Sequence, residues 1–109
     1  MAYDEELAAR LHAVLDGRDD VRERKMFGGL ALMVAGNMAV GIIGDELMVR
    51  VGPESYEDVL DLPHARIMDF TGRPMKGFVS VATEGFAADA DLRAWVQRGV
   101  AYAVSLPPK

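Results

Sequence analysis

Two short stretches of the sequence set basic side chains beside glycines. They are ERKMFGGLAL (23–32) and FTGRPMKGFV (70–79). Their basic residues and the glycines of interest are Arg24, Lys25, Gly28, Gly29, Arg73, Lys76 and Gly77. Cationic side chains and the free backbone N–H groups of glycine-containing turns are the groups that bind phosphate or carboxylate. If the two stretches lie side by side, they predict a small-anion or nucleotide site.

A purely structural interpretation of the second stretch competes with that prediction. Arg73-Pro74-Met75-Lys76 has proline at the favoured second position of a β-turn, with its basic ends free to face solvent. The sequence alone does not show whether the two stretches are neighbours. The same seven residues therefore stay candidates for anion binding or for contact with a partner.

Catalytic and metal-binding patterns are sparse. The two histidines lack metal-ligand spacing, and the three serines lack a nucleophile-elbow context. The chain has no cysteine, which excludes disulfides, thiolate catalysis and the usual structural zinc sites. Asp69 is the one acid near Arg73 and Lys76, and a surface ion pair explains it. We predict no catalytic residue, no metal and no cofactor; an enzyme acting on a phosphorylated metabolite is the least favoured alternative.

Composition limits the class of protein. The 109 residues predict one domain over 1–109, and 50% hydrophobic with 27% charged residues is an ordinary globular balance. The net charge of −5 argues against direct binding of nucleic acid, which depends on neutralising phosphates. No apolar run approaches the roughly 20 residues of a membrane span, and no signal peptide opens the chain. We expect a cytoplasmic protein with no membrane segment.

Hydrophobic periodicity and turn residues predict the elements. Helical spacing follows Asp4, a candidate cap, and turn dipeptides at Gly36-Asn37 and Gly44-Asp45 separate apolar runs. The predicted helices cover 4–17, 53–63 and 89–107, and the predicted strands cover 24–35, 38–43, 46–51, 65–70 and 77–82. Gly28-Gly29 would mark a bulge inside the first strand, and Ser55 with Asp58 would form a capping box. The order α-β-β-β-α-β-β-α predicts an α+β fold with a mainly antiparallel five-stranded sheet and packed helices.

The methionines and the single tryptophan could lie either in the core or at a binding surface. Most of the seven methionines are expected to fill the core, because methionine adapts to irregular gaps. Met26 and Met75 are the candidates for an adaptable partner-binding surface. Trp95 is expected to anchor the last helix in the core rather than to stack on a ligand.

Four blocks of the sequence resemble a known family. ERKMFGGLALMVAGNMAVGI, DELMVRVGPE, DFTGRPMKGFVSV and the closing LRAWVQRGVAYAVSLPPK look like the N-terminal domain of the TfoX/Sxy family. The resemblance implies an α+β fold of the secretion-chaperone-like type. It also implies kinship with regulators of natural competence, which are thought to help the cyclic-AMP receptor protein activate promoters.

From this resemblance we expect a small regulatory module that acts by protein–protein contact. Its partner would be a protein, with the transcription machinery as one candidate. We also expect a homodimer formed through a sheet edge or a helix face, because exposed strand edges need a cover. Full-length members of the family carry a second, helical domain, and the resemblance here extends over the N-terminal domain alone.

Overall fold

The computed structural model describes residues 3–26, 28–68 and 76–108. Its elements, in chain order, are α1 (Glu5–Val14), β1 (Val21–Met26), β2 (Gly29–Val34), β3 (Asn37–Ile43), β4 (Glu46–Arg50), α2 (Tyr56–Leu60), β5 (Ala65–Ile67), β6 (Phe78–Val81), the 3-10 turn η1 (Thr83–Phe86) and α3 (Asp89–Ser105). The strands form one antiparallel sheet in the order β1-β2-β3-β4-β6-β5. The predicted α+β class is confirmed, but the sheet has six strands rather than five.

The sixth strand arises because the stretch predicted as one strand over 24–35 is a hairpin. Gly28 has a φ of +76°, and Gly29 pairs with Met26 across the turn. A Cβ at Gly29 would lie 2.2 Å from the carbonyl oxygen of Ile42, so only glycine lets β2 pass β3 this closely. The predicted bulge at Gly28-Gly29 is therefore wrong. The irregularity in pairing lies further along, at Leu32/Met33 against β3.

The turns on either side of β3 lie at or next to the predicted turn residues. Gly44-Asp45 joins β3 to β4 as predicted, since Ile43 pairs with Glu46 and Gly44 has a φ of +61°. The turn between β2 and β3 sits one residue earlier than predicted, at Ala35-Gly36, where both residues have positive φ. Asn37, expected in that turn, is instead the buried first residue of β3.

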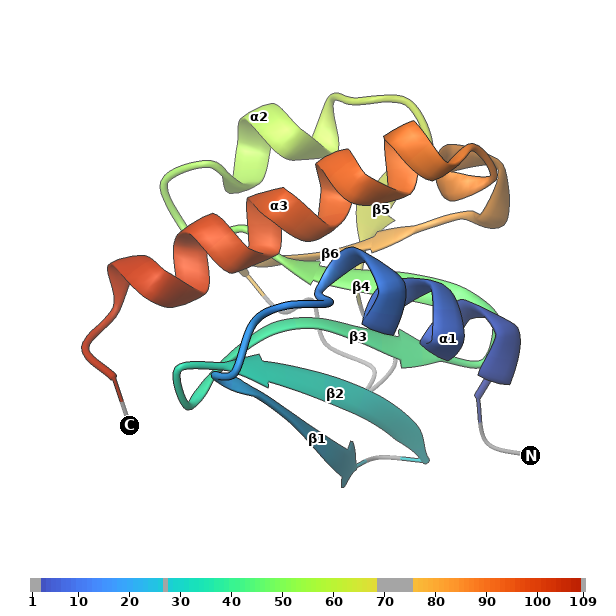
Figure 1. Cartoon of the computed structure of the whole chain (residues 1–109). Helices are drawn as coiled ribbons and strands as arrows, with labels where there is room; N and C mark the ends of the chain where they lie inside the picture. The colour runs from blue at the N-terminus through green and yellow to red at the C-terminus, as the bar shows by residue number, and fades with distance from the viewer. Residues whose placement is uncertain (1–2, 27, 69–75, 109) are drawn as a thin grey trace.

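All three helices lie on one face of the sheet, with α3 running along it (Figure 1). The main core between the two layers contains leucines and valines of the strands together with Leu11, Leu92, Trp95 and Val96 of the helices. Trp95 is 7% exposed and donates its indole N–H to the carbonyl oxygen of Gly85 at 3.1 Å, which confirms it as a core anchor. None of the described helices is both long and apolar enough to cross a membrane.

The helix ends agree with the sequence at one site and disagree at another. The Asp4 carboxylate accepts hydrogen bonds from the N–H groups of Glu6 and Leu7, so the predicted cap of α1 is confirmed. Ser55 precedes α2 but makes no side-chain capping bond, so the predicted capping box is wrong. Its backbone is already helical at ψ −6°, whereas a capping side chain usually comes from an extended residue.

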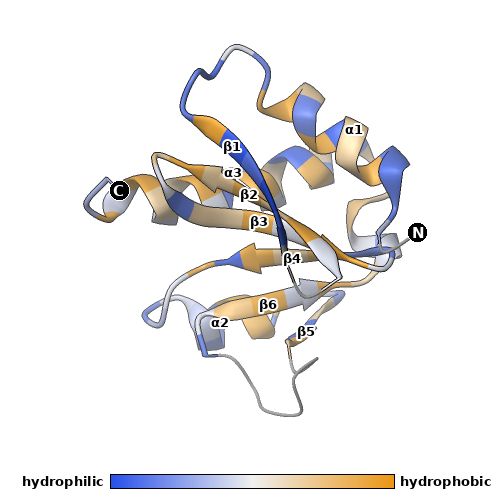
Figure 2. Cartoon of the chain, turned by 90° about the horizontal axis from the view of Figure 1, so that it is seen from below, coloured by the Kyte–Doolittle hydropathy of each residue, from blue (hydrophilic) through white to orange (hydrophobic). Residues whose placement is uncertain are grey.

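Within the part of the chain that the structure describes, no helix covers the opposite face of the sheet. Figure 2 looks toward this face, and the ribbon of β1 is mostly hydrophilic whereas those of β2, β3 and β4 are mostly hydrophobic. We call it the open face. The side chains that strand alternation places there form the candidate site.

Candidate interaction surface

The strand registers align one row of residues across the whole open face. From one edge of the sheet to the other, the row is Arg24, Ala31, Gly41, Met48, Ser80 and Arg66. Each of the middle four alternates with residues of the helix-side core, so its side chain, or in glycine its Cα hydrogen, lies on the open face. The row has an arginine at each end and small or apolar residues through most of its middle.

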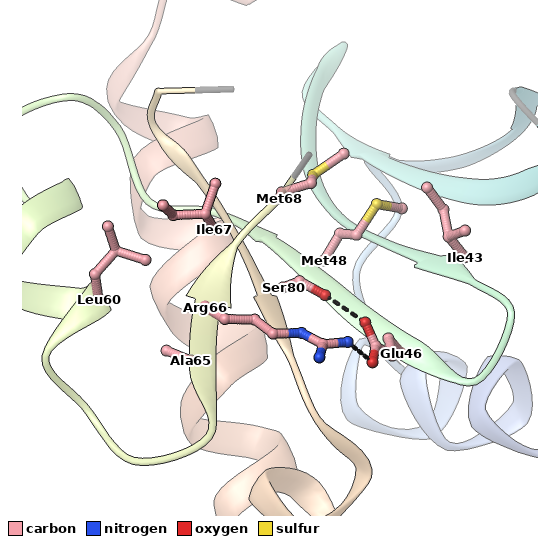
Figure 3. A pocket seen from close by; sticks show the side chains of 9 residues that line it. All are labelled: Ile43, Glu46, Met48, Leu60, Ala65, Arg66, Ile67, Met68 and Ser80. Atoms are coloured by element: carbon pink, nitrogen blue, oxygen red, sulfur yellow. Dashed lines mark hydrogen bonds and ion pairs between the residues drawn. The ribbon is translucent and has the colours of Figure 1, made fainter. Parts of the chain in front are cut away.

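Methionines provide much of the apolar surface around this row. The methyl carbons of Met38 and Met48 each lie 3.0 Å from the position that a Cβ would occupy at Gly41. The glycine therefore leaves a space that two flexible side chains fill. Alternation with core residues puts Met33 on the same face, and Met68 lies beside Met48 in Figure 3.

Among the methionines with described side chains, the expected burial holds for Met48 and Met68, whereas Met33 and Met38 are half-buried. Met48 and Met68 are buried, at 5% exposure each, but neither they nor Met33 and Met38 belong to the clusters packed between the sheet and the helices. The two methionines predicted for a partner surface cannot be placed, because the side chain of Met26 and the whole of Met75 lie outside the described residues.

Three polar residues, Glu46, Ser80 and Arg66, lie next to Met48 and Met68 on the open face. They line a pocket of about 740 Å³ around β5, drawn in Figure 3. The Ser80 hydroxyl donates to the Glu46 carboxylate at 2.8 Å, and the Arg66 guanidinium pairs with the same carboxylate. Ser80 is 7% exposed, whereas the Arg66 side chain is 58% exposed and keeps part of its guanidinium in solvent.

The polar groups that line this pocket are paired with one another. Its carboxylate is balanced by a guanidinium, and every buried side-chain nitrogen or oxygen of the described residues has a hydrogen-bond partner. The described residues also contain no group of three acidic, histidine or cysteine side chains that could hold a metal ion. An apolar surface with a few satisfied polar groups is the usual composition of a recognition site.

The basic residues singled out from the sequence do not converge. Arg24 and Lys25 lie on β1, at one edge of the sheet, while Lys76 directly precedes the turn into β6, and β2, β3 and β4 stand between them. They also lie toward opposite ends of the strands, since Lys25 belongs to the row that contains Val81, at the end of β6, whereas Lys76 precedes Phe78, at its start. The adjacency that a joint anion site needs is therefore missing for these three residues. Arg73 lies outside the described residues, as does Asp69.

The glycines of the two stretches have structural roles. Gly28 and Gly29 make the first hairpin, as described above. The Gly77 carbonyl accepts hydrogen bonds from the N–H groups of Val51 and Gly52, at 2.8 and 3.0 Å, and Gly77 has a φ of +94°. This joins the end of β4 to the start of β6.

Arg50, which we did not single out from the sequence, stacks on two aromatic rings beside that junction. Its guanidinium carbon lies 5.6 Å from the centre of the Phe78 ring and 5.3 Å from that of Tyr102. Likewise, no motif marked Glu46, Ser80 or Arg66, because they come from three strands and meet only in the sheet. The one usable sequence signal was their alternation with apolar residues.

Comparison with known proteins identifies the family of the chain. The family model described as TfoX N-terminal domain matches residues 13–103 of the chain. A search of curated proteins returned no match. The match covers most of the sequence, including all six strands, and the chain therefore belongs to the TfoX N-terminal domain family.

Proposed function

We propose that this TfoX N-terminal domain is a small regulatory module that binds a partner protein through the open face of its sheet. The observation that carries the proposal is the apolar lining of the face opposite the described helices, where Ala31 and Met48 are buried and Met33, Met38 and Ile43 are half-buried. A sheet ordinarily buries an apolar face against another layer. Kinship with competence regulators supports a regulatory role for such a contact.

The sheet edges are poorer candidates for the contact than the face. β1 carries four charged residues in six, Arg22 to Lys25, and β5 has only three residues. Charged and very short edge strands are two of the means by which proteins prevent strand addition. This favours docking on the open face over a homodimer formed by edge pairing.

Methionine suits a surface that must adapt to a partner. Its unbranched, polarizable side chain can take several conformations at little cost, and it is common on surfaces that repack against their partners. Met33 and Met38 are half-buried and so remain in reach of a partner.

Site-specific photo-crosslinking tests the proposal. A photoreactive amino acid is placed at Arg24 or Arg66, which are exposed at the two edges of the open face, in cells that produce the chain. Matched controls carry it at Glu57 and Arg93, which are exposed on α2 and α3. We expect both open-face positions to capture the same protein and both helix positions to capture none of it.

Two results would overturn the proposal. Capture of that protein from the helix positions alone would move the contact to the other side of the molecule. A product of twice the monomer mass as the sole adduct would replace the partner protein by a second copy of the chain.

A further inference from the structure

The charges of this acidic protein are divided between its two faces. The helical elements α1, α2, η1 and α3 carry seven acidic residues, Glu5, Glu6, Glu57, Asp58, Glu84, Asp89 and Asp91, against the three arginines 10, 93 and 98. The open face has the opposite sign. Strand alternation places Arg22 and Arg24 on it, because Val21 packs against the core and Glu23 pairs with His12 of α1 on the other side.

Among the described residues, the surplus of positive charge on the open face is not cancelled locally. Glu46 is already paired with Arg66, so it does not neutralise Arg22 or Arg24 at the far edge of the sheet. A partner that presents carboxylates would be attracted to this face even though the whole chain has a net charge of −5.

The dimensions of the row favour one kind of partner segment. Arg24 and Arg66 are separated by five strand-to-strand intervals. At about 4.8 Å each, these intervals add to about 24 Å. An α-helix of about 16 residues has the same length. A helix with an apolar stripe could lie along the row against the half-buried Met33 and Met38, with acidic residues near one end facing Arg22 and Arg24.

We infer that the occupant of the open face is an acidic amphipathic helix of a partner protein. This inference rests on the proposed function and specifies its partner. A second copy of the chain fits less well, because an isologous contact would set the basic face against itself. The helices of a second copy offer carboxylates, but the apolar sides of α1 and α3 are already buried in their own core.

Two synthetic peptides test the inference. Both have about 16 residues and the same leucine stripe, but one has glutamates and the other lysines at all remaining positions. Each is titrated into the ¹⁵N-labelled full chain. We expect the glutamate peptide to shift the amide signals of Ala31, Gly41, Met48 and Ser80. It should bind at least about tenfold more tightly than the lysine peptide, and added salt should lower its affinity.

Arg24 and Lys25 supply a matched pair of variants. They are adjacent, basic and exposed on β1, but they point to opposite faces of the sheet. Arg24→Glu should lower the affinity for the glutamate peptide roughly fivefold, because it replaces an attraction by a repulsion. Lys25→Glu makes the same change in net charge and should alter the affinity by less than about twofold. Circular dichroism checks that both variants are folded.

The outcomes separate the inference from the proposed function. Equal affinity of the two peptides, with shifts on the open face, would overturn the acidic preference and leave the open face as the docking surface. Shifts confined to α2 and α3 would overturn both. Failure of the glutamate peptide to bind at millimolar concentration, or equal effects of the Arg24 and Lys25 variants, would overturn the inference.

Discussion

Replacing Asn37 with alanine should loosen the attachment of α3 to the sheet. The side chain is 2% exposed, and its amide nitrogen donates to the carbonyl oxygens of Ala103 at 3.3 Å and Pro107 at 3.0 Å. The Ala103 oxygen keeps a second donor, the N–H of Leu106, whereas the bond to Pro107 is lost outright. Two net hydrogen bonds of about 0.5–1.5 kcal/mol each give a loss of about 2 kcal/mol in the free energy of unfolding.

Urea and thermal unfolding of Asn37→Ala, followed by circular dichroism, measure this loss. For a domain of this size, 2 kcal/mol corresponds to a fall in Tm of roughly 10 °C. A change below about 0.5 kcal/mol would refute the reasoning, since it would mean that the two bonds contribute no more than an ordinary surface contact.

The Asn37→Asp variant provides a control with a pH signature. At neutral pH its carboxylate only accepts hydrogen bonds, so it would face two carbonyl oxygens and destabilise the fold more than alanine does. This penalty requires an ionised carboxylate, and folding raises the pKa of such a group above the value of about 3.9 that it has in the unfolded chain. The stability of the variant, relative to the natural chain, should therefore rise as the pH falls from 7 toward 4.

Two further predictions concern single positions. Gly52→Ala should lower the free energy of unfolding more than Gly17→Ala, because both glycines have φ near +90° but only at Gly52 would the new Cβ meet a side chain, 2.3 Å from the Tyr102 ring. Urea unfolding compares the two; Gly17→Ala should cost about 1 kcal/mol from backbone strain alone, and equal losses would contradict the predicted clash. The pKa of Asp20 is held below its usual value mainly by the hydrogen bonds from Arg18, so the stabilising effect of this pair is present at neutral pH and is lost as the pH falls through the lowered pKa. In an NMR titration, Arg18→Ala should raise the pKa of Asp20, and an unchanged titration curve would show that the pair does not persist in solution.

Local patterns in the sequence were enough to predict the fold class and most elements. The alternation of apolar residues around Gly44-Asp45 predicts the hairpin that the structure has, and Asp4 caps α1 as expected. These features depend on contacts between residues a few positions apart, so their signal is visible in a short stretch of sequence. The family could be recognised for the same reason, since its blocks are local motifs in a characteristic order.

Tertiary structure decided where those motifs lie relative to one another. β6 pairs with β4 rather than with β1, which carries Lys76 away from Arg24 and Lys25 and prevents a joint anion site among these three. No local signal specifies strand order, because it is set by pairings between segments far apart in the sequence.

The tertiary structure also decided which face of the sheet the helices leave uncovered. Each face of β4 contains apolar residues, with Leu47 and Val49 on the helix side and Met48, between Glu46 and Arg50, on the other. Period-two alternation distinguishes two faces but does not say which of them the helices cover. The sequence by itself therefore determined the α+β class, the turns and the family. The packing of α3 against the leucine and valine face decided which methionines and arginines are left together on the other.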